Sequence, residues 1–271
     1  MVANSDTNID YRERIADDDS YITKSDGKSA FPSLGFYSRL AKIIYSYGKM
    51  ARKNKYGPKE WVDSSLDILK ALEDVGVILE FSGMENLRKP EGNVMFLGNH
   101  MSTLETVVLP SIIQPVKNVT FVVKHELLSY PYFSDILRSR DPIVVGRSNP
   151  REDLMKVMND GSRYLNSDKS IIIFPQKTRS KFFDPSSFNS LGIKLAKKNH
   201  AAVIPIALVT DAWPNGSLIK DAGKIQTKRT VHICFGEPFF VESPAGTAEQ
   251  QRVIDFITSK LIEWGREDCL V

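Results

Sequence analysis

Cysteine and histidine are scarce in this chain. Its 271 residues include two cysteines, Cys234 and Cys269, and four histidines. Two cysteines are too few for a disulfide framework, and neither lies at a spacing typical of a metal site. These absences argue against a disulfide-stabilised secreted fold and favour a reducing, cytoplasmic setting with no metal site.

Long apolar runs are also missing. The N-terminal residues are polar and acidic, unlike the apolar segment of a secretory signal. The uncharged stretch from Thr106 to Val116 is only about half as long as the ~20 residues of a membrane-spanning helix. With 42% hydrophobic residues, the composition is that of an ordinary globular protein that can bury a sizeable core.

Acidic residues are absent between Asp26 and Glu60. The same stretch carries eight basic residues: Lys28, Arg39, Lys42, Lys49, Arg52, Lys53, Lys55 and Lys59. Its large apolar residues recur at helical spacing: Phe36, Leu40, Ile43, Ile44 and Tyr47. The pattern predicts a basic amphipathic helix, which suits either an anionic membrane surface or packing on the core with a solvated basic face. No nucleic-acid-binding motif accompanies the charge, so we expect no nucleic-acid partner.

Strand and helix patterns alternate from about residue 77 onward. Apolar β-type runs occur at seven places: Val77–Phe81, Val94–Leu97, Val119–Val123, Ile143–Val145, Ile171–Phe174, Val203–Leu208 and Val231–Phe235. Helical patterns separate most of them, and a final helix is expected from about Ala248 to Trp264. Such alternation predicts an α/β fold with a mixed, largely parallel sheet flanked by helices. We expect three parts: a mobile tail at 1–28, an N-terminal amphipathic helical extension at 29–75, and an α/β domain at 76–271.

The main candidate for catalysis is one histidine followed closely by one carboxylate. His100 comes soon after the run Val94–Leu97, and Glu105 lies five residues later. If a helix begins after Ser102, the two side chains can meet, and the carboxylate can orient an imidazole that acts as a general base. The same residues also fit a capping box, in which Glu105 only bonds the backbone at the start of the helix. This pattern by itself leaves both interpretations open.

Two polar loops that follow buried strands are candidates for ligand binding. The run Ile171–Phe174 opens into a loop that carries Gln176, Lys177, Thr178, Arg179, Ser180 and Lys181. The run Ile143–Val145 is followed by Gly146, Arg147 and Ser148. Loops at the carboxyl ends of sheet strands are where α/β proteins bind ligands, and an arginine beside hydroxyl groups suits a phosphate. An ordinary basic surface loop would have the same composition.

Taken together and in this order, these motifs resemble the four blocks of the glycerolipid acyltransferase family, the family of 1-acylglycerol-3-phosphate acyltransferase-like proteins. The segment from Asn99 to Glu105 is similar to the family's Asn-His-x-x-x-x-Asp. The second block corresponds to Lys124–Leu127 with Pro131 and Arg147. The third, Phe-Pro-Glu-Gly-Thr-Arg-Ser, corresponds to Phe174–Ser180, and the fourth to Val203–Ile206. The resemblance covers about residues 94 to 209.

The resemblance implies an O-acyltransferase that uses an acyl thioester and needs no cofactor. His100 would remove the proton from an acceptor hydroxyl, which attacks acyl-CoA or acyl carrier protein directly, and Glu105 would orient His100. The acceptor would be a lysophospholipid, most simply 1-acylglycerol-3-phosphate, giving phosphatidic acid. Its phosphate would be bound by Arg147, Thr178, Arg179, Ser180 and Lys181. The enzyme would sit peripherally on the cytoplasmic face of the membrane, with segment 29–59 against anionic lipids.

The sequence departs from the family pattern at three of these positions. Glu105 replaces Asp and is one methylene longer, so the pairing needs a slightly retracted helix or a different rotamer. Gln176 and Lys177 replace the Glu and Gly of the third block, which removes a negative charge and adds a positive one. This change leaves open another acceptor, such as a different lysophospholipid, an amino-acid lipid or a glycolipid. A non-catalytic lipid-binding homologue is a further alternative, and it would release no thiol from an acyl thioester.

Overall fold

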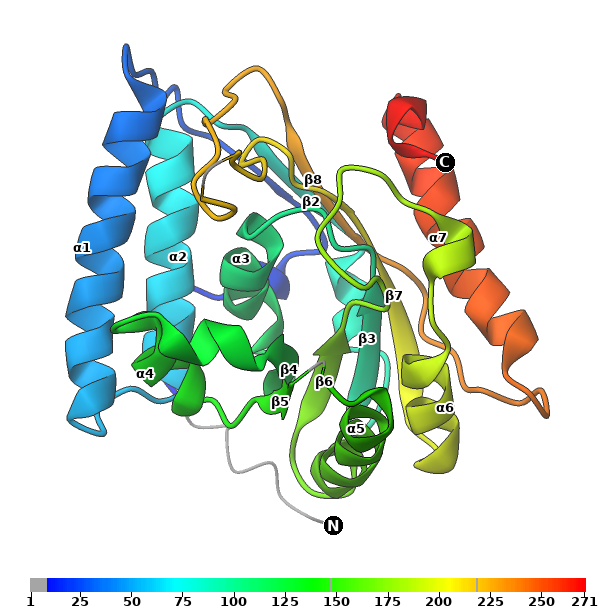
Figure 1. Cartoon of the computed structure of the whole chain (residues 1–271). Helices are drawn as coiled ribbons and strands as arrows, with labels where there is room; N and C mark the ends of the chain where they lie inside the picture. The colour runs from blue at the N-terminus through cyan, green and yellow to red at the C-terminus, as the bar shows by residue number, and fades with distance from the viewer. Residues whose placement is uncertain (1–8, 147, 218) are drawn as a thin grey trace.

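The computed structural model describes residues 9–146, 148–217 and 219–271. In these residues an eight-stranded sheet runs through the molecule in the order β1-β2-β8-β7-β3-β6-β4-β5 (Figure 1). The strands are β1 (Tyr21–Ile22), β2 (Leu79–Ser82), β3 (Val94–Gly98), β4 (Val119–Lys124), β5 (Ile143–Val145), β6 (Ser170–Ile173), β7 (Ala202–Val209) and β8 (Val231–Phe235).

The sheet is mixed and largely parallel, as the alternating patterns predict. Strands β7, β3, β6, β4 and β5 form a continuous parallel set, and β2 is parallel to β8. Only the pairs β1–β2 and β7–β8 are antiparallel within the described sheet. Because neighbouring strands of the parallel set run the same way, their carboxyl ends lie along one edge of the sheet.

Helices cover both faces of the sheet (Figure 1). On one side lie α1 (Pro32–Arg52), α2 (Pro58–Asp74), α3 (Leu104–Ile113) and α4 (Phe133–Arg138). On the other side lie α5 (Pro150–Leu165), α6 (Leu191–Lys198) and α7 (Thr247–Glu263). Short 3-10 turns occur at Ile15–Asp17, Met84–Leu87, His125–Ser129, Pro185–Ser187 and Glu267–Cys269.

The central strand β3 shows how the sheet separates two cores. Val94 and Phe96 face the core shared with α1, α2 and α3, whereas Met95 and Leu97 face the core shared with α5, α6 and α7. Successive side chains of a strand point to opposite faces, so a strand covered on both sides must be apolar at every position. This explains why its sequence is a continuous apolar run rather than an alternating one.

Helix α3 lies inside the first of these cores. It packs against α2, which in turn packs against α1. Eight of its ten residues are buried, and they are spread around the helix. A helix that is apolar on all sides is typical of a buried position, and here that position holds the start of α3 firmly against the sheet.

Parts of segment 9–28, which composition predicts to be a tail, pack on the domain. Strand β1 pairs with β2, and the Tyr21 ring stacks on Phe81 with centroids 5.3 Å apart. The Tyr21 hydroxyl donates to Glu73 at 2.7 Å, and Ile15 is buried. A few apolar side chains among acidic neighbours are enough to hold this segment on the domain, because the edge of the sheet supplies their packing and hydrogen-bond partners. Residues 1–8 of the predicted tail lie outside the described residues.

The expected boundary at residues 75/76 does not separate two cores. Helices α1 and α2 contribute Phe36, Leu40 and Leu69 to the same cluster as Phe96 of β3. The N-terminal helical segment is therefore packed on the α/β domain as part of it. Within the described residues, every helix is too short or too polar to cross a bilayer.

Candidate active site

The carboxyl ends of β3, β6 and β7 bring the candidate residues together. Asn99 and His100 directly follow β3, and Thr210 directly follows β7. The Asn99 side chain accepts from the Leu208 N–H at 2.9 Å and donates to the Leu208 carbonyl at 2.8 Å. These two bonds continue the β3–β7 pairing past Gly98 and fix the turn at which His100 leaves the sheet.

The side chains of His100 and Glu105 meet at the start of α3. His100 Nδ1 lies 2.9 Å from Glu105 Oε1. The helix begins at Leu104, so His100 stays in the preceding turn while Glu105 enters the first helical turn. This is the helix start that the pairing requires, and the longer Glu side chain reaches the imidazole.

Glu105 also bonds the backbone of this turn. It therefore both pairs with His100 and contacts the backbone at the start of the helix, as the two interpretations of the motif separately predict. The side chain is fully buried, with an exposed fraction of 0%. It accepts hydrogen bonds from the N–H groups of Met101 and Ser102 at 2.8 and 2.9 Å, and from the Thr210 hydroxyl at 2.6 Å. The carboxylate is thereby held in one position beneath the imidazole.

The environment keeps Glu105 ionised. Burial alone would raise its pKa, but the hydrogen bond and charge of His100 and the hydrogen bonds from Thr210 and Ser102 outweigh burial and lower the pKa from its ordinary value. An ionised carboxylate can only accept hydrogen bonds, so His100 Nδ1 must carry the proton that it donates. In the neutral imidazole the lone pair is then on Nε2, which has no hydrogen-bond partner among the residues that the structure describes.

The loop after β6 positions His100 from the other side. The imidazole stacks on the Phe174 ring, with centroids 4.4 Å apart and an interplanar angle of 5°. The His100 carbonyl accepts from the Ser180 N–H at 2.9 Å. The side chain of His100 keeps an exposed fraction of 18%, so a substrate can reach it. Ring, backbone and carboxylate contacts together fix the orientation of a partly open imidazole.

Gln176 faces inward rather than toward a ligand. Its side chain is buried, its Oε1 accepts from the His100 N–H at 2.7 Å, and its Nε2 donates to the Phe182 carbonyl at 3.3 Å. An amide can accept and donate at once, whereas an ionised Glu could only accept. The departure from the family pattern at this position therefore joins the turn between β3 and α3 to the loop after β6, and the structure does not place Gln176 as an acceptor contact.

Arg179 lies beside the start of α3. Its guanidinium donates to the Thr103 hydroxyl and to Asp221 Oδ1. Nearby, Lys220 Nζ donates to the Thr178 hydroxyl at 2.6 Å. The loop between β7 and β8 thus reaches over to the loop after β6 at two adjacent positions, and Arg179 is part of the same edge as His100.

Two of the basic residues predicted for the acceptor site do not gather there. Lys181 turns away and pairs with Asp268 at 2.7 Å, because the chain after it bonds to the C-terminal segment through the Phe183 N–H and the Cys269 carbonyl. Lys177 is exposed. Arg147 lies outside the described residues. Among the residues described, the structure therefore brings Thr178, Arg179 and Ser180 to the site but not Lys181.

Three residues contribute to the site although the sequence analysis assigned them no function: Phe174, Thr210 and Asp221. Phe174 directly follows β6 and Thr210 directly follows β7, so their positions after buried strands are a signal that could have been used. Asp221 has no such signal. It lies in an irregular loop, 42 residues from Arg179 along the chain.

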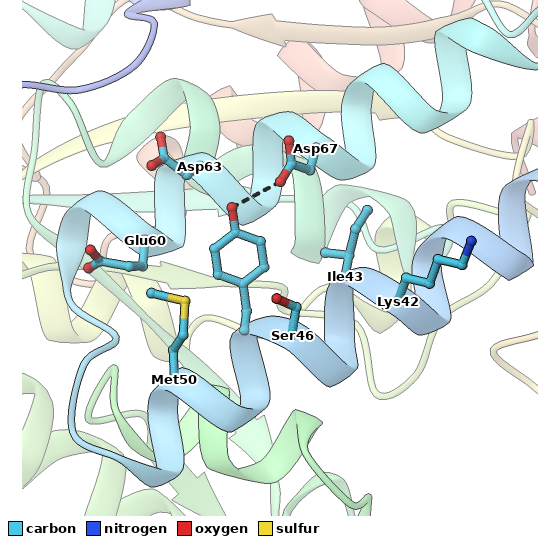
Figure 2. A pocket seen from close by; sticks show the side chains of 8 residues that line it. Lys42, Ile43, Ser46, Met50, Glu60, Asp63 and Asp67 are labelled. Carbon is cyan, nitrogen blue, oxygen red and sulfur yellow. Dashed lines mark hydrogen bonds between the residues drawn. The ribbon is translucent and has the colours of Figure 1, made fainter.

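A separate hollow lies between α1 and α2 (Figure 2). Its volume is about 390 Å³, and carboxylates of α2 face α1 across it. Tyr47 donates to Asp67 at 2.9 Å, while Arg12 pairs with Asp67 and Lys59 with Asp63. Arg12 and Lys59 already neutralise Asp67 and Asp63. The lining residues include none of the His100 site, so we assign this hollow to helix packing.

A histidine–carboxylate pair at the carboxyl edge of a largely parallel sheet, with both groups held by buried contacts, is the arrangement that the motifs predict for the acyltransferase class. Residues 78–209 match the sequence model of the family described as Acyltransferase. The match covers just under half of the chain, and over this segment it confirms the resemblance stated from the sequence.

Individual relatives agree with the family match. The chain is 33% identical over 152 residues to the 1-acyl-sn-glycerol-3-phosphate acyltransferase of Pseudomonas aeruginosa, covering 56% of this chain and 57% of that protein. It is 29% identical over 139 residues to the protein of the same name from Borreliella burgdorferi, covering 49% and 52%. The chain thus spans little more than half the length of these relatives.

One solved structure has the same fold. The crystal structure of the 1-acyl-sn-glycerophosphate (LPA) acyltransferase PlsC from Thermotoga maritima superposes with a TM-score of 0.65 over 86% of this chain and 95% of that chain. The sequence identity is 18%. At this identity the comparison bears on the fold alone, and it confirms the predicted α/β class.

Proposed function

We propose that this protein transfers a fatty acyl group from an acyl thioester to a free hydroxyl of a lysophospholipid, most simply 1-acylglycerol-3-phosphate. The observation that carries the proposal is the contact between His100 Nδ1 and the buried carboxylate of Glu105 at 2.9 Å, which leaves Nε2 to act as the base. The names of the relatives support the choice of acceptor. The donor is acyl-CoA or acyl carrier protein.

The proposed reaction needs one base and no covalent enzyme intermediate. His100 Nε2 takes the proton of the acceptor hydroxyl as that oxygen attacks the thioester carbonyl. The new C–O bond forms, the C–S bond breaks, and the thiolate leaves with the proton returned by the imidazolium. Glu105 stabilises the imidazolium while it exists, because its charge lies 2.9 Å from Nδ1.

Arg179 is the proposed anchor for the acceptor phosphate. Its guanidinium lies next to Thr103, three residues after His100, so a phosphate bound there places a glycerol hydroxyl near the imidazole. Holding the two reactants at a fixed separation supplies a large part of the rate enhancement in such a direct transfer. Arg147 of the second block remains a proposed second contact.

We further propose that α1 places the protein on the cytoplasmic face of a membrane. Near its N-terminal end Phe31 and Leu34 are exposed at 73% and 70%, and Lys42 and Lys49 are exposed along the helix. Apolar side chains next to lysines suit an anionic lipid surface, which is also where a lysophospholipid acceptor resides.

The substitution His100→Ala tests the proposal. Mass spectrometry of the product lipid and release of free thiol from the donor measure transfer independently. We expect a loss of about 100-fold or more, since the base is removed, with a lower melting temperature because the buried Glu105 loses a hydrogen-bond partner. The matched control is His200→Asn, which removes an exposed histidine in the left-handed region where asparagine is tolerated. Substantial residual transfer by His100→Ala would refute the assignment.

A further inference from the structure

The anion site proposed for the acceptor already holds a carboxylate. Arg179 donates to Asp221 Oδ1, and the Thr103 hydroxyl donates to the same oxygen at 2.7 Å. The side chains of Arg179 and Asp221 have exposed fractions of 15% and 30%. The guanidinium proposed to bind a phosphate is therefore paired with a carboxylate of this chain, beside Thr103 at the start of α3.

Asp221 is held in place by the core. Its carbonyl accepts from Trp213 Nε1 at 3.1 Å, and Trp213 is buried with its ring 4.8 Å from that of Phe36 in α1. Two residues later, the Gly223 carbonyl accepts from the Tyr37 hydroxyl at 2.5 Å. These contacts hold the main chain on both sides of the Asp221 side chain and so keep its carboxylate next to Arg179. The pairing is thus built into the fold.

The charge of Asp221 persists in this setting. Burial alone would raise its pKa, but the hydrogen bonds from Thr103 and Arg179 outweigh burial and lower the pKa below its ordinary value. An ionised carboxylate beside the guanidinium cancels the charge that attracts a phosphate monoester. It also repels a second anion placed close to it.

We propose that Asp221 determines acceptor selectivity by competing with the acceptor's phosphate for Arg179. The inference rests on the proposed function and names the group that tunes it. A phosphate monoester must displace the Asp221 carboxylate from Arg179, and it offers no cationic group with which the displaced carboxylate can pair. A phosphodiester that carries an ammonium group gives the displaced carboxylate a new partner. Asp221 therefore reduces the advantage of 1-acylglycerol-3-phosphate over a zwitterionic lysophospholipid.

The decisive variant is Asp221→Asn, which keeps the shape and the hydrogen-bond acceptor but removes the charge. Transfer is measured with 1-acylglycerol-3-phosphate and with lysophosphatidylethanolamine. We expect KM for the first acceptor to fall by about fivefold, the upper range for a partly exposed ion pair, with little change in kcat. KM for the second acceptor is expected to stay the same or rise. An equal change for both acceptors, or a change confined to kcat, would overturn the inference.

Two control variants separate charge from structure. Asp221→Glu restores the charge on a longer side chain, and we expect it to return selectivity toward that of the wild type. Asp255→Asn removes one negative charge from α7, on the far side of the sheet, and should leave the ratio of the two KM values unchanged. Selectivity that shifts equally in Asp255→Asn would mean that net charge, not the Arg179 site, is responsible.

A binding measurement distinguishes failure of this inference from failure of the proposed function. Calorimetry with glycerol 3-phosphate and with glycerophosphoethanolamine needs neither turnover nor a membrane. Tighter binding of the monoester alone in Asp221→Asn supports the inference even if no acceptor is acylated. Unchanged affinities overturn it even if transfer to 1-acylglycerol-3-phosphate is found.

Discussion

At the scale of single residues, the site depends on groups that do two things at once. Glu105 orients the imidazole and also accepts from two backbone N–H groups of the turn that carries it. Gln176 joins the His100 N–H to the Phe182 carbonyl. Because the geometry of the proposed site and the local structure depend on the same side chains, substitutions of these residues are expected to change stability and activity together.

We expect Glu105→Gln to lower the free energy of unfolding by about 1–3 kcal/mol at pH 7, because a buried acceptor is replaced in part by a donor. The folded state lowers the pKa of Glu105, so its charge contributes stability above the ordinary carboxyl pKa and loses that contribution as pH falls through the lowered value. The difference between variant and wild type should therefore shrink in acid. Urea unfolding at several pH values measures it.

The control for this experiment is Glu126→Gln, which changes an exposed carboxylate in the His125–Ser129 turn. It should alter the unfolding free energy by less than about 0.5 kcal/mol at any pH. A difference for Glu105→Gln that does not depend on pH would show that its charge contributes nothing to folding.

At the scale of elements, the sequence predicts regular structure well where apolar runs are long. All seven predicted strands are present, and the run Ile143–Val145 coincides with β5. Strand β1 was missed because its two residues, Tyr21 and Ile22, lie among polar neighbours and depend on pairing with β2. The start of α3 at Leu104 was required by the histidine–carboxylate hypothesis and is observed.

The contact between α1 and α4 gives a prediction at this scale. A Cβ at Gly48 would lie 2.5 Å from Tyr132 Cβ and 2.9 Å from the Tyr132 carbonyl oxygen, so Gly48→Ala forces the two helices apart. The helix itself would gain up to about 1 kcal/mol from alanine, and we expect a net loss of about 1–3 kcal/mol from the clash. Thermal unfolding measures the result.

The control is Ser46→Ala, at an exposed position of α1, which should be neutral or slightly stabilising. A Gly48→Ala variant as stable as this control would contradict the prediction.

At the scale of the whole molecule, the sheet separates the side that carries the proposed membrane-docking helix from the opposite side. Helices α1 to α4 lie on one side and α5 to α7 on the other (Figure 1). The basic helix α1 is the outermost element of its side and contributes Phe36 to the core that holds Trp213. A membrane docked on α1 would therefore lie close to the loop that carries Asp221.

We expect the double substitution of Lys42 and Lys49 to Gln to weaken binding to anionic vesicles. Each lysine near such a surface contributes about 1 kcal/mol, so loss of both corresponds to about 30-fold weaker binding at low salt. Cosedimentation at increasing salt measures it, and the difference should vanish as charges are screened. The control changes Lys194 and Lys198 of α6 to Gln, and an equal loss in that variant would mean that α1 is not the docking surface.

The sequence by itself determined the local elements and the chemistry that they carry. Continuous apolar runs specify strands buried on both faces, and the spacing of His100 and Glu105 allows the pair once a helix starts after Ser102. The order of the four blocks identified the family. These features are local or follow chain order, so they can be read without knowing which segments meet.

Only the tertiary structure decided which loops face one another. It packs residues 9–28 on the domain, turns Gln176 inward, directs Lys181 to Asp268, and sets Asp221 on Arg179. Each of these outcomes is a contact between segments that the sheet order brings together, and the energy of such a contact depends on burial and partners that no local pattern contains. His100 as the proposed base was therefore predictable from the sequence. The pairing of Asp221 with Arg179, the proposed phosphate-binding residue, was not.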